Sequence, residues 1–349
     1  MKPATDTTEA ALLNQIQSTI PVVEHPFAEL ARKVGTNEDQ VIQRLQSLKS
    51  DGIIRQISAI FDTRSLGYES SLVAARVDPS RVDEAAAIIS RHPGVSHNYL
   101  RNHSFNLWYT IAVSPLSGLV LEKTVDILHR ESGADSTRLL PTLRLYKIGV
   151  KFDVGDESRP DDQDAPQYTE TKRAADTSLT PTEIEFIRIM QRDLPLTPTP
   201  FVDYACELGI SFGELQALHQ RFLDTGKMRR FAAVLHHRKA GFSANAMGVW
   251  AVPGDDVELD RIGKMMAGFR AVSHCYKRPT YPDWPYNIFT MVHGKTREEC
   301  ERTLGAIAEK TVIRDHSALY STKEYKKVRV RYFTGEEEEW EREHIPERL

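Results

Sequence analysis

The segment GIIRQISAIFDTRSLGY (52–68) occurs twice, because a second version of it, GKMRRFAAVLHHRKAGF (226–242), follows later in the chain. A shorter motif, VSHNYLR (95–101), likewise returns as VSHCYKR (272–278). The two offsets, 226 − 52 = 174 and 272 − 95 = 177, are nearly equal. A period this long indicates a duplicated domain pair rather than a solenoid repeat.

Helical patterns precede each copy of this segment. In the first half they are EAALLNQIQS (9–18), HPFAELARKVG (25–35) and EDQVIQRLQSLKSDG (38–52), and Thr36 or Asn37 can cap the third helix. In the second half they are SLTPTEIEFIRIMQRD (178–193), FVDYACELG (201–209) and SFGELQALHQRFLDTG (211–226). Helices in this order, followed by an alternating strand, are typical of a winged helix-turn-helix unit.

A different unit follows each wing. The first copy predicts strands at 71–78, 95–102 and 105–113, helices at 80–92 and 118–132, and a closing strand in TLRLYKIG (142–149). In the second copy the closing strand is predicted within STKEYKKVRVRYF (321–333), and TYPDWP (280–285) is an insertion between the two middle strands. The order β-α-β-β-α-β is that of a ferredoxin-like unit. The predicted fold class is therefore α+β, a tandem duplication of a winged helix-turn-helix and a ferredoxin-like domain.

The repeat also predicts the domain bounds. These are helix-turn-helix domains at 1–62 and 179–238, ferredoxin-like domains at 63–152 and 239–334, an acidic linker at 153–178 and a charged tail at 335–349. The linker contains proline and few large apolar side chains, so it is expected to be flexible. The tail is expected to be a solvated helix or a frayed end. The two halves would form an internal pseudo-dimer, and further association into a homo-oligomer stays open.

The bulk composition limits the class of protein. The 349 residues carry a formal net charge of −4 and 40% hydrophobic residues, so folded cores are expected and no overall basic field attracts nucleic acid. The chain shows neither a basic-then-apolar leader nor a run of about 18 apolar residues, which predicts a cytoplasmic protein without membrane contact. Cys206, Cys275 and Cys300 match neither a disulfide framework nor a CxxC metal spacing, and Cys275 is expected to pack.

Each half carries the polar trio His-x-Tyr-x-Arg on a predicted strand. Because strand side chains alternate between faces, the members of each trio share one face: His97, Tyr99 and Arg101 in the first half, and His274, Tyr276 and Arg278 in the second. A neutral imidazole can ligate iron axially, an imidazolium can donate a proton, and a guanidinium binds carboxylates. Common ancestry of the halves is the simpler alternative explanation of the repeated trio.

A helix-turn-helix followed by a ferredoxin-like domain resembles the Lrp/AsnC family of transcription regulators. The closer resemblance is to the siroheme decarboxylases, which are two related subunits or a fusion of them. The first half is similar to one subunit in HNYLRNHSFNLWYTI (97–111) and LYKIGVKFD (145–153). The second half is similar to the partner in MRRFAAVLHHRKAGF (228–242) and SHCYKRPTYPDWPYNIFTMVHG (273–294). The resemblance covers nearly all of the chain apart from the linker and the tail.

This resemblance implies a carboxy-lyase that removes carbon dioxide from two acetate side chains of siroheme. The product would be 12,18-didecarboxysiroheme, on the route to heme or to d-type heme, and no cofactor is implied beyond the iron of the substrate. In Lrp-like proteins the open sheet faces pair across a dimer, so His97 and His274 are expected to line the gap between the two halves. His274, with His97 as its partner or counterpart, would ligate the iron or protonate the ring carbon beside the scissile acetate. Tyr276 and Arg278 complete the catalytic candidates.

The resemblance also suggests side chains that bind the peripheral carboxylates or the macrocycle. Arg229 and Arg230 either bind carboxylates, with one of the two facing the ligand, or form a solvated basic turn. Trp284 either forms an aromatic wall or plugs the core, and its presence favours the second half as the main pocket. The remaining substrate-binding candidates are Arg101, Tyr99, His103, Asn287, Lys326, Lys147 and His236. Asn287 and the two lysines could instead have a purely structural role, and His236 could lie in a surface turn.

Two other functions stay open. A regulator of the Lrp/AsnC type, one that senses heme for example, would bind DNA through its helix-turn-helix units. The predicted recognition helices, however, begin near Glu38, Asp39 and Glu214, and early acidic residues repel phosphates. DNA is therefore not an expected partner. A tetrapyrrole carrier would bind siroheme without changing it.

Overall fold

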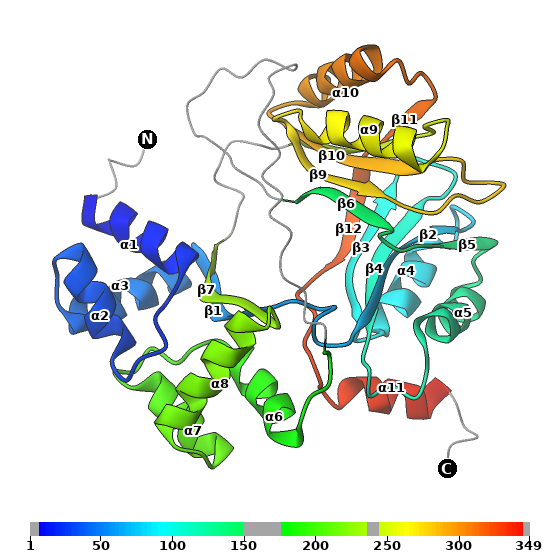
Figure 1. Ribbon diagram of the computed structural model, residues 1–349. Coiled ribbons are helices and arrows are strands. Elements are labelled where there is room, and N and C mark those ends of the chain that lie inside the picture. Colours follow the sequence, from blue (N-terminus) through cyan, green and yellow to red (C-terminus); the bar gives the residue numbers. More distant parts are fainter. Residues whose placement is uncertain (1–6, 149–175, 236–243, 345–349) are drawn as a thin grey trace.

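The computed structural model of the protein describes residues 7–148, 176–235 and 244–344. Figure 1 shows the helix-turn-helix units side by side at one end and two five-stranded sheets at the other. The predicted linker at 153–178 falls almost wholly outside the described residues, and so does the wing end at 236–243.

Each helix-turn-helix unit contains the three predicted helices. The bounds are α1 Thr7–Ser18, α2 Pro26–Val34 and α3 Glu38–Ser50, then α6 Pro181–Met190, α7 Pro200–Leu208 and α8 Phe212–Asp224. Asn37 caps α3, because its side chain accepts a hydrogen bond from the backbone of Gln40 at 2.9 Å. Thr180 and Ser211 each form a capping box with the glutamate three residues later. Local sequence therefore determines where these helices begin.

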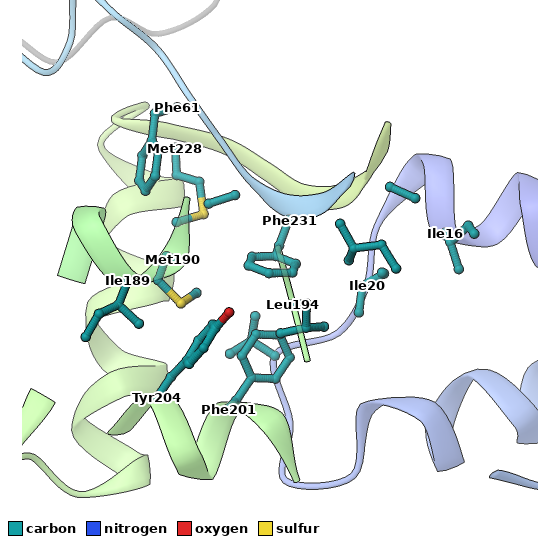
Figure 2. Close-up of a cluster of buried hydrophobic side chains, with 14 of the residues drawn as sticks. Ile16, Ile20, Phe61, Ile189, Met190, Leu194, Phe201, Tyr204, Met228 and Phe231 are labelled. Carbon is teal, nitrogen blue, oxygen red and sulfur yellow. The ribbon is translucent and has the colours of Figure 1, made fainter. Parts of the chain in front are cut away.

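The two helix-turn-helix units share one hydrophobic core. Their wings, β1 Ile54–Phe61 and β7 Met228–Leu235, pair as a two-stranded antiparallel sheet. Ile20 donates its backbone N–H to the carbonyl of Phe231 at 2.8 Å, and Leu194 does the same to Ile57 at 2.8 Å, so each unit is tied to the wing of the other. Figure 2 shows Ile20 of the first half beside Phe231 of the second.

The ferredoxin-like units follow the predicted order as far as their second helix, and each then ends in a strand that was not predicted. The first contains β2 Glu69–Arg76, α4 Val82–Arg91, β3 Val95–Arg101, β4 Leu107–Val113, α5 Leu121–Ser132 and β5 Ser136–Leu140. The second contains β8 Ala244–Trp250, α9 Asp256–Ala267, β9 Val272–Lys277, β10 Ile288–Gly294, α10 Arg297–Thr311 and β11 His316–Leu319. The duplicated α+β architecture is thereby confirmed.

The closing strands correct the prediction, because the halves exchange them. Segment 142–149 was expected to complete the first sheet, yet β6 Arg144–Ile148 pairs with β9 of the second half. Likewise β12 Ser321–Lys327 pairs with β3 of the first half. The sheet orders are β12-β3-β4-β2-β5 and β11-β8-β10-β9-β6. The exchange occurs because β5 and β11 already complete the sheets of their own halves. The strand that follows each of them therefore pairs with the open edge of the sheet in the opposite half.

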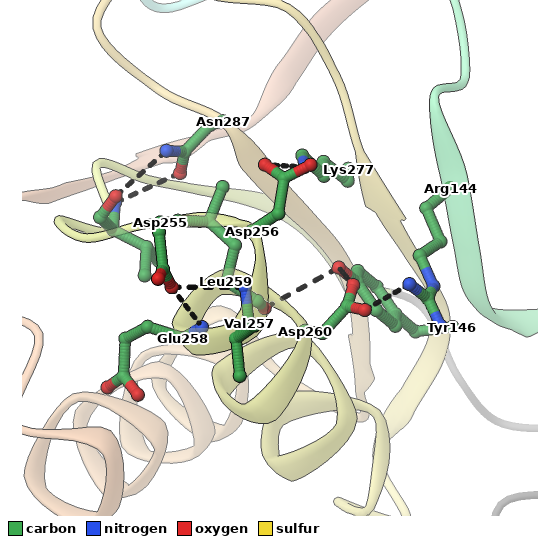
Figure 3. Close-up of polar contacts among 11 residues, drawn as sticks. Arg144, Tyr146, Asp255, Asp256, Val257, Glu258, Leu259, Asp260, Lys277 and Asn287 are labelled. Carbon is green, nitrogen blue, oxygen red and sulfur yellow. Dashed lines mark hydrogen bonds and ion pairs between the residues drawn. The ribbon is translucent and has the colours of Figure 1, made fainter.

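Contacts with α9 hold β6 in this sheet (Figure 3). The hydroxyl of Tyr146 donates to Asp260 at 2.7 Å, and Arg144 forms an ion pair with the same carboxylate. Gly263 on α9 lies under the Tyr146 ring, where a Cβ atom would be 2.4 Å from Tyr146 Cε2. A small residue on the helix therefore lets the exchanged strand approach.

The two sheets pack against each other through the faces that their helices leave open. Helices α4 and α5 cover the first sheet, and α9 and α10 cover the second (Figure 1). The buried side chains between the inner faces come from both halves: Ala74, Phe105, Trp108, Leu140, Met247, Val249, Trp284, Phe289 and Leu319. The expected pairing of open sheet faces is confirmed.

The tail forms helix α11 Glu336–His344 and packs on the first ferredoxin-like unit. Trp340 is buried in that unit's core, and Glu341 accepts a hydrogen bond from the backbone of Gly118 at 3.2 Å. Of the two expected alternatives, the charged helix is therefore correct for residues 336–344, but the helix is not wholly solvated, because Trp340 packs into a hydrophobic core. Within the described ranges, no helix has the length and apolar character needed to span a membrane.

Candidate functional site

The repeated trios lie as the alternation of strand side chains predicts. On β3 the ring centres of His97 and Tyr99 are 6.1 Å apart, and the Arg101 guanidinium is 5.9 Å from the Tyr99 ring. On β9 the His274 and Tyr276 rings are also 6.1 Å apart, with the Arg278 guanidinium 4.8 Å from Tyr276. The two halves therefore present the same arrangement of imidazole, phenol and guanidinium. Cys275 faces the opposite side and is buried, as expected.

A serine orients each histidine. Ser96 Oγ lies 3.0 Å from His97 Nδ1, and Ser273 Oγ lies 2.7 Å from His274 Nδ1. Burial lowers the pKa of His274 to about 4, with a contribution from His293. Burial also lowers the pKa of His97, and the positive charge of Lys327 acts in the same direction. Both imidazoles are therefore neutral near pH 7, with the Nε2 atom left to interact with a ligand.

The two arginines of the trios join the halves. Arg101 donates to the carbonyl of Leu319, the last residue of β11, at 3.0 Å. Arg278 donates in the same way to the carbonyl of Leu140, the last residue of β5. Both guanidinium groups are buried, which lowers the pKa of each to about 10. Part of their role is thus structural, because each one satisfies a buried strand-end carbonyl of the opposite half.

A cavity of about 1030 Å³ opens beside His97. Its walls are β1, the neighbourhood of His97 on β3, the end of α6 and the segment 328–335, which connects β12 to α11 and which we call the strap. We call this space the His97 cavity. Because β1 and β3 belong to the first half and α6 and the strap to the second, neither half builds the cavity alone.

The His97 cavity is positively charged. Arg55 and Arg329 line it, and Arg230 is close enough that its charge, like that of Arg55, lowers the pKa of Arg329 beyond the effect of burial. Among the ion pairs between described residues, none includes these three arginines, whereas Arg192 in the same wall pairs with Glu207. A cluster of cations without carboxylate partners is suited to bind a polyanionic ligand.

Trp284 and His103 lie away from this cavity. Trp284 is fully buried between the sheets, 5.2 Å from the Trp108 ring and 5.5 Å from Phe105. The His103 ring lies 5.3 Å from Trp284, and its Nδ1 accepts the backbone N–H of Phe105 at 3.0 Å. In this position Trp284 fills the core, which is the alternative to the aromatic wall, because the insertion folds inward over an apolar surface. The position of Trp284 therefore does not single out the second half as the main pocket.

The other polar candidates of the second strand region have structural contacts. Asn287 donates to the carbonyl of Val252 at 2.8 Å and accepts from its N–H at 3.0 Å. Lys147 donates to Phe269 O at 2.9 Å, and Lys326 donates to Ser90 O at 2.7 Å. These bonds fasten the loops and the exchanged strands, which is the structural alternative, and substrate binding by the three side chains stays a prediction.

The wing arginines differ from each other. Arg229 forms an ion pair with Asp62 at 2.6 Å, while Arg230 belongs to the unpaired cluster at Arg329. The prediction that one of the two faces a ligand is consistent with this division. His236 lies outside the described residues.

Two important residues of the cavity were not predicted. Arg329 was assigned to a closing strand, although the alternating basic side chains in KKVRVRYF (326–333) indicate one charged face. Gln191 gave no local signal, because its two hydrogen bonds to Tyr332 join residues 141 positions apart.

Comparison with known proteins agrees with this architecture. The model of the AsnC-like ligand binding domain matches residues 65–147 and 239–326, and that of the siroheme decarboxylase NirDL-like HTH domain matches 9–55 and 183–229. The chain is 41% identical to the siroheme decarboxylase of Hydrogenobacter thermophilus over 334 residues, which cover 96% of this chain and 97% of the relative. This chain belongs to the siroheme decarboxylase family.

Two further relatives show how the family is organised. The siroheme decarboxylase beta subunit of Methanosarcina barkeri is 47% identical over 150 residues, which is 43% of this chain and 97% of that subunit. A crystal structure of the siroheme decarboxylase NirDL with an iron-uroporphyrin III analogue superposes with a TM-score of 0.78 at 35% identity, covering 98% of this chain and 99% of that one. The family membership favours the enzyme over the regulator among the functions that the sequence left open.

Proposed function

We propose that this protein is a carboxy-lyase that converts siroheme into 12,18-didecarboxysiroheme, for use in the formation of heme or d-type heme. The observation that carries the proposal is the full-length match to a siroheme decarboxylase at 41% identity. The iron-uroporphyrin analogue bound to the NirDL relative supports a tetrapyrrole as the ligand class. The iron would be that of the substrate, and no other cofactor is part of the proposal.

The His97 cavity fits the chemistry of such a substrate. Siroheme carries acetates and propionates around a flat macrocycle, and guanidinium groups bind carboxylates in bidentate geometry. Arg55 and Arg329 would hold carboxylates at the rim, with Arg230 adding positive charge. The imidazole of His97 would then lie against the ring. By the repeat, His274 is the counterpart in the second half.

The neutral histidines suit two steps of the reaction. A neutral imidazole can ligate the substrate iron, or it can take up a proton when the substrate's carboxylates raise its pKa, and can then deliver that proton to the ring. Protonation of the ring carbon beside the acetate makes the ring an electron sink. The C–C bond then breaks, carbon dioxide leaves, and the bonding electron pair moves towards the ring to form an exocyclic double bond. Transfer of the added proton from the ring carbon to the exocyclic carbon restores the ring and leaves a methyl group.

The test is anaerobic incubation of the purified protein with siroheme, followed by mass spectrometry of the extracted pigment. We expect the loss of two carbon dioxide units. Unchanged pigment that stays bound would instead identify a carrier, and a protein that neither binds nor converts siroheme would contradict the proposal. Location in the cytoplasm and further assembly of the internal pseudo-dimer belong to the same proposal and need fractionation and solution mass measurements.

A further inference from the structure

A small recess adjoins the His97 cavity between the two sheets. Its volume is about 250 Å³, and it shares Ser96 and Val330 with the cavity. Its polar lining comes from the loop after β1, from β2 and β4, and from the second half: Thr63, Arg64, Ser70, Thr110, Tyr276 and Arg278. We call it the Arg278 recess. Because Ser96 Oγ lies 3.0 Å from His97 Nδ1, the wall that the recess shares with the cavity lies beside the imidazole.

Arg278 has no carboxylate partner among the described residues that line this recess. Arg278 is 8% exposed; it donates to the Leu140 carbonyl and lies over the rings of Tyr276 and Phe289, while its Nε has no hydrogen-bond partner. Among the described residues, the lining contains arginine and hydroxyl groups but no carboxylate. The carboxylate of Asp62, adjacent to Thr63 in the chain, is engaged by Arg229.

Burying a cation without an anionic partner costs free energy. A ligand that brings an anion into the recess best explains why such a group is buried there. The pKa of Arg278, about 10, keeps the guanidinium charged near neutral pH. Ser70, Thr110 and Tyr276 contribute hydroxyl groups to the same lining. This is the chemistry of a carboxylate site.

We propose that the Arg278 recess receives one acetate arm of the tetrapyrrole that occupies the His97 cavity, and this inference rests on the proposed function. The carboxylate of an acetate arm is separated from the ring by only one methylene group. It can therefore enter a recess that adjoins His97, the residue that lies against the ring. A guanidinium favours the ionised carboxylate over its neutral product, so the arm held here is not the one being cleaved. Arg278 is then a positioning residue that sets the rotation of the macrocycle relative to His97.

The experiment compares two iron porphyrins that differ only in the arms concerned. Iron uroporphyrin has acetates and propionates, whereas iron coproporphyrin has methyl groups in place of the acetates. Dissociation constants are measured by Soret absorbance for the full chain and for Arg278→Gln, in which an amide remains to donate to Leu140. We expect the substitution to weaken iron uroporphyrin binding roughly 10- to 100-fold, the range for a charged hydrogen bond, and to leave iron coproporphyrin binding nearly unchanged.

An equal loss for both porphyrins would overturn the inference, because it would show a structural effect or a propionate contact. Ser70→Glu and Ser70→Gln provide a second test if Arg278→Gln does not fold. The glutamate places a carboxylate of the protein in the recess, so it should weaken iron uroporphyrin binding more than the glutamine of similar volume does; equal effects would also overturn the inference. If the unsubstituted protein binds neither porphyrin, the proposed function itself fails, which is a distinguishable result.

Discussion

The side-chain amide of Gln191 bonds to both backbone polar groups of Tyr332. Its Nε2 donates to the Tyr332 carbonyl at 2.8 Å, and its Oε1 accepts the Tyr332 N–H at 2.7 Å. Gln191 ends α6 of the second helix-turn-helix unit, whereas Tyr332 belongs to the strap that walls the His97 cavity. Gln56 of the first wing donates to the Gln191 carbonyl at 2.7 Å. The helix-turn-helix units therefore hold one wall of the cavity in place.

Replacing Gln191 by leucine should loosen the strap. Two partly buried backbone groups would lose their partner, so we expect the free energy of unfolding to fall by about 1–3 kcal/mol and iron uroporphyrin to bind more weakly. Denaturant unfolding and Soret titration measure the two effects. The matched control is Gln220→Leu, since the Gln220 amide contacts only the side chain of Asp224 on an exposed helix surface. Unchanged binding in the Gln191 variant would show that the strap holds its position without this bridge.

Replacing Arg329 by glutamine should weaken the binding of a polyanionic tetrapyrrole. Arg329 is half-buried and has no carboxylate partner among the described residues, so its charge is available to the ligand. We expect a loss of roughly 10-fold or more in affinity for iron uroporphyrin and a weaker dependence of affinity on salt. Arg302→Gln is the control, because Arg302 is exposed on α10 and lies 4.0 Å from Glu299. The idea is lost if the two variants bind equally well.

The two histidines should respond differently to truncation if one cavity dominates catalysis. Loss of an acid–base group typically costs about 100- to 10,000-fold in rate, so we expect His97→Ala to lose at least 100-fold in siroheme turnover. The same measurement on His274→Ala shows whether the second half contributes an equivalent site. Full turnover by His97→Ala together with an inactive His274→Ala would move the active cavity to the second half.

The docking of α11 should depend on pH through Glu337. Burial raises the pKa of Glu337 to about 7, from an ordinary value of 4.5. The folded state therefore binds this proton more tightly than the unfolded state does, and the stability it contributes is present below about pH 4.5 and lost as the pH rises through about 7. Glu337→Gln should accordingly stabilise the protein by about 1–3 kcal/mol at pH 8 and have little effect near pH 4.5.

The difference between the unfolding free energies of Glu337→Gln and the unsubstituted protein, followed from pH 4.5 to 8, measures this effect. The difference removes the contribution of the buried histidines, which is common to both proteins and has the opposite sign. His274, with its pKa lowered to about 4, reduces stability as the pH falls from about 6.5 towards 4. A difference that does not change with pH would contradict the assignment to Glu337.

Gly263 should be required for the exchanged strand. A Cβ atom at this position would lie 2.4 Å from the Tyr146 ring, so Gly263→Ala must displace either α9 or β6. We expect a loss of about 1–3 kcal/mol in the free energy of unfolding, as for other overpacked sites. Gly305→Ala on α10 is the control, because nothing lies within 4 Å of its added Cβ atom, and a gain of roughly 0.5–1 kcal/mol is expected there. Equal stability of the two variants would refute this packing argument.

Much of the fold is readable from the sequence because it depends on short-range rules. The caps at Asn37, Thr180 and Ser211 fix helix starts through bonds that span three residues. The period-two pattern places His97 and Tyr99 on one face of a strand, and the repeat predicts the same for the second half. The family resemblance rests on the same local motifs, which is why it could be recognised before any contact was known.

The helices, most of the strands, the duplication and the chemical types at the trios follow from patterns in the sequence. Strands β5 and β11, the exchange of β6 and β12, the burial of Trp284 and the hold of Gln191 on the strap emerge from the tertiary structure. These features join residues far apart in the chain, such as Tyr146 with Gly263, so no local pattern encodes them. An open strand edge needs a strand to pair with, and an apolar surface needs another apolar surface to pack against; each takes whichever partner the whole fold brings near. In a duplicated chain, each half offers the other half an equivalent partner.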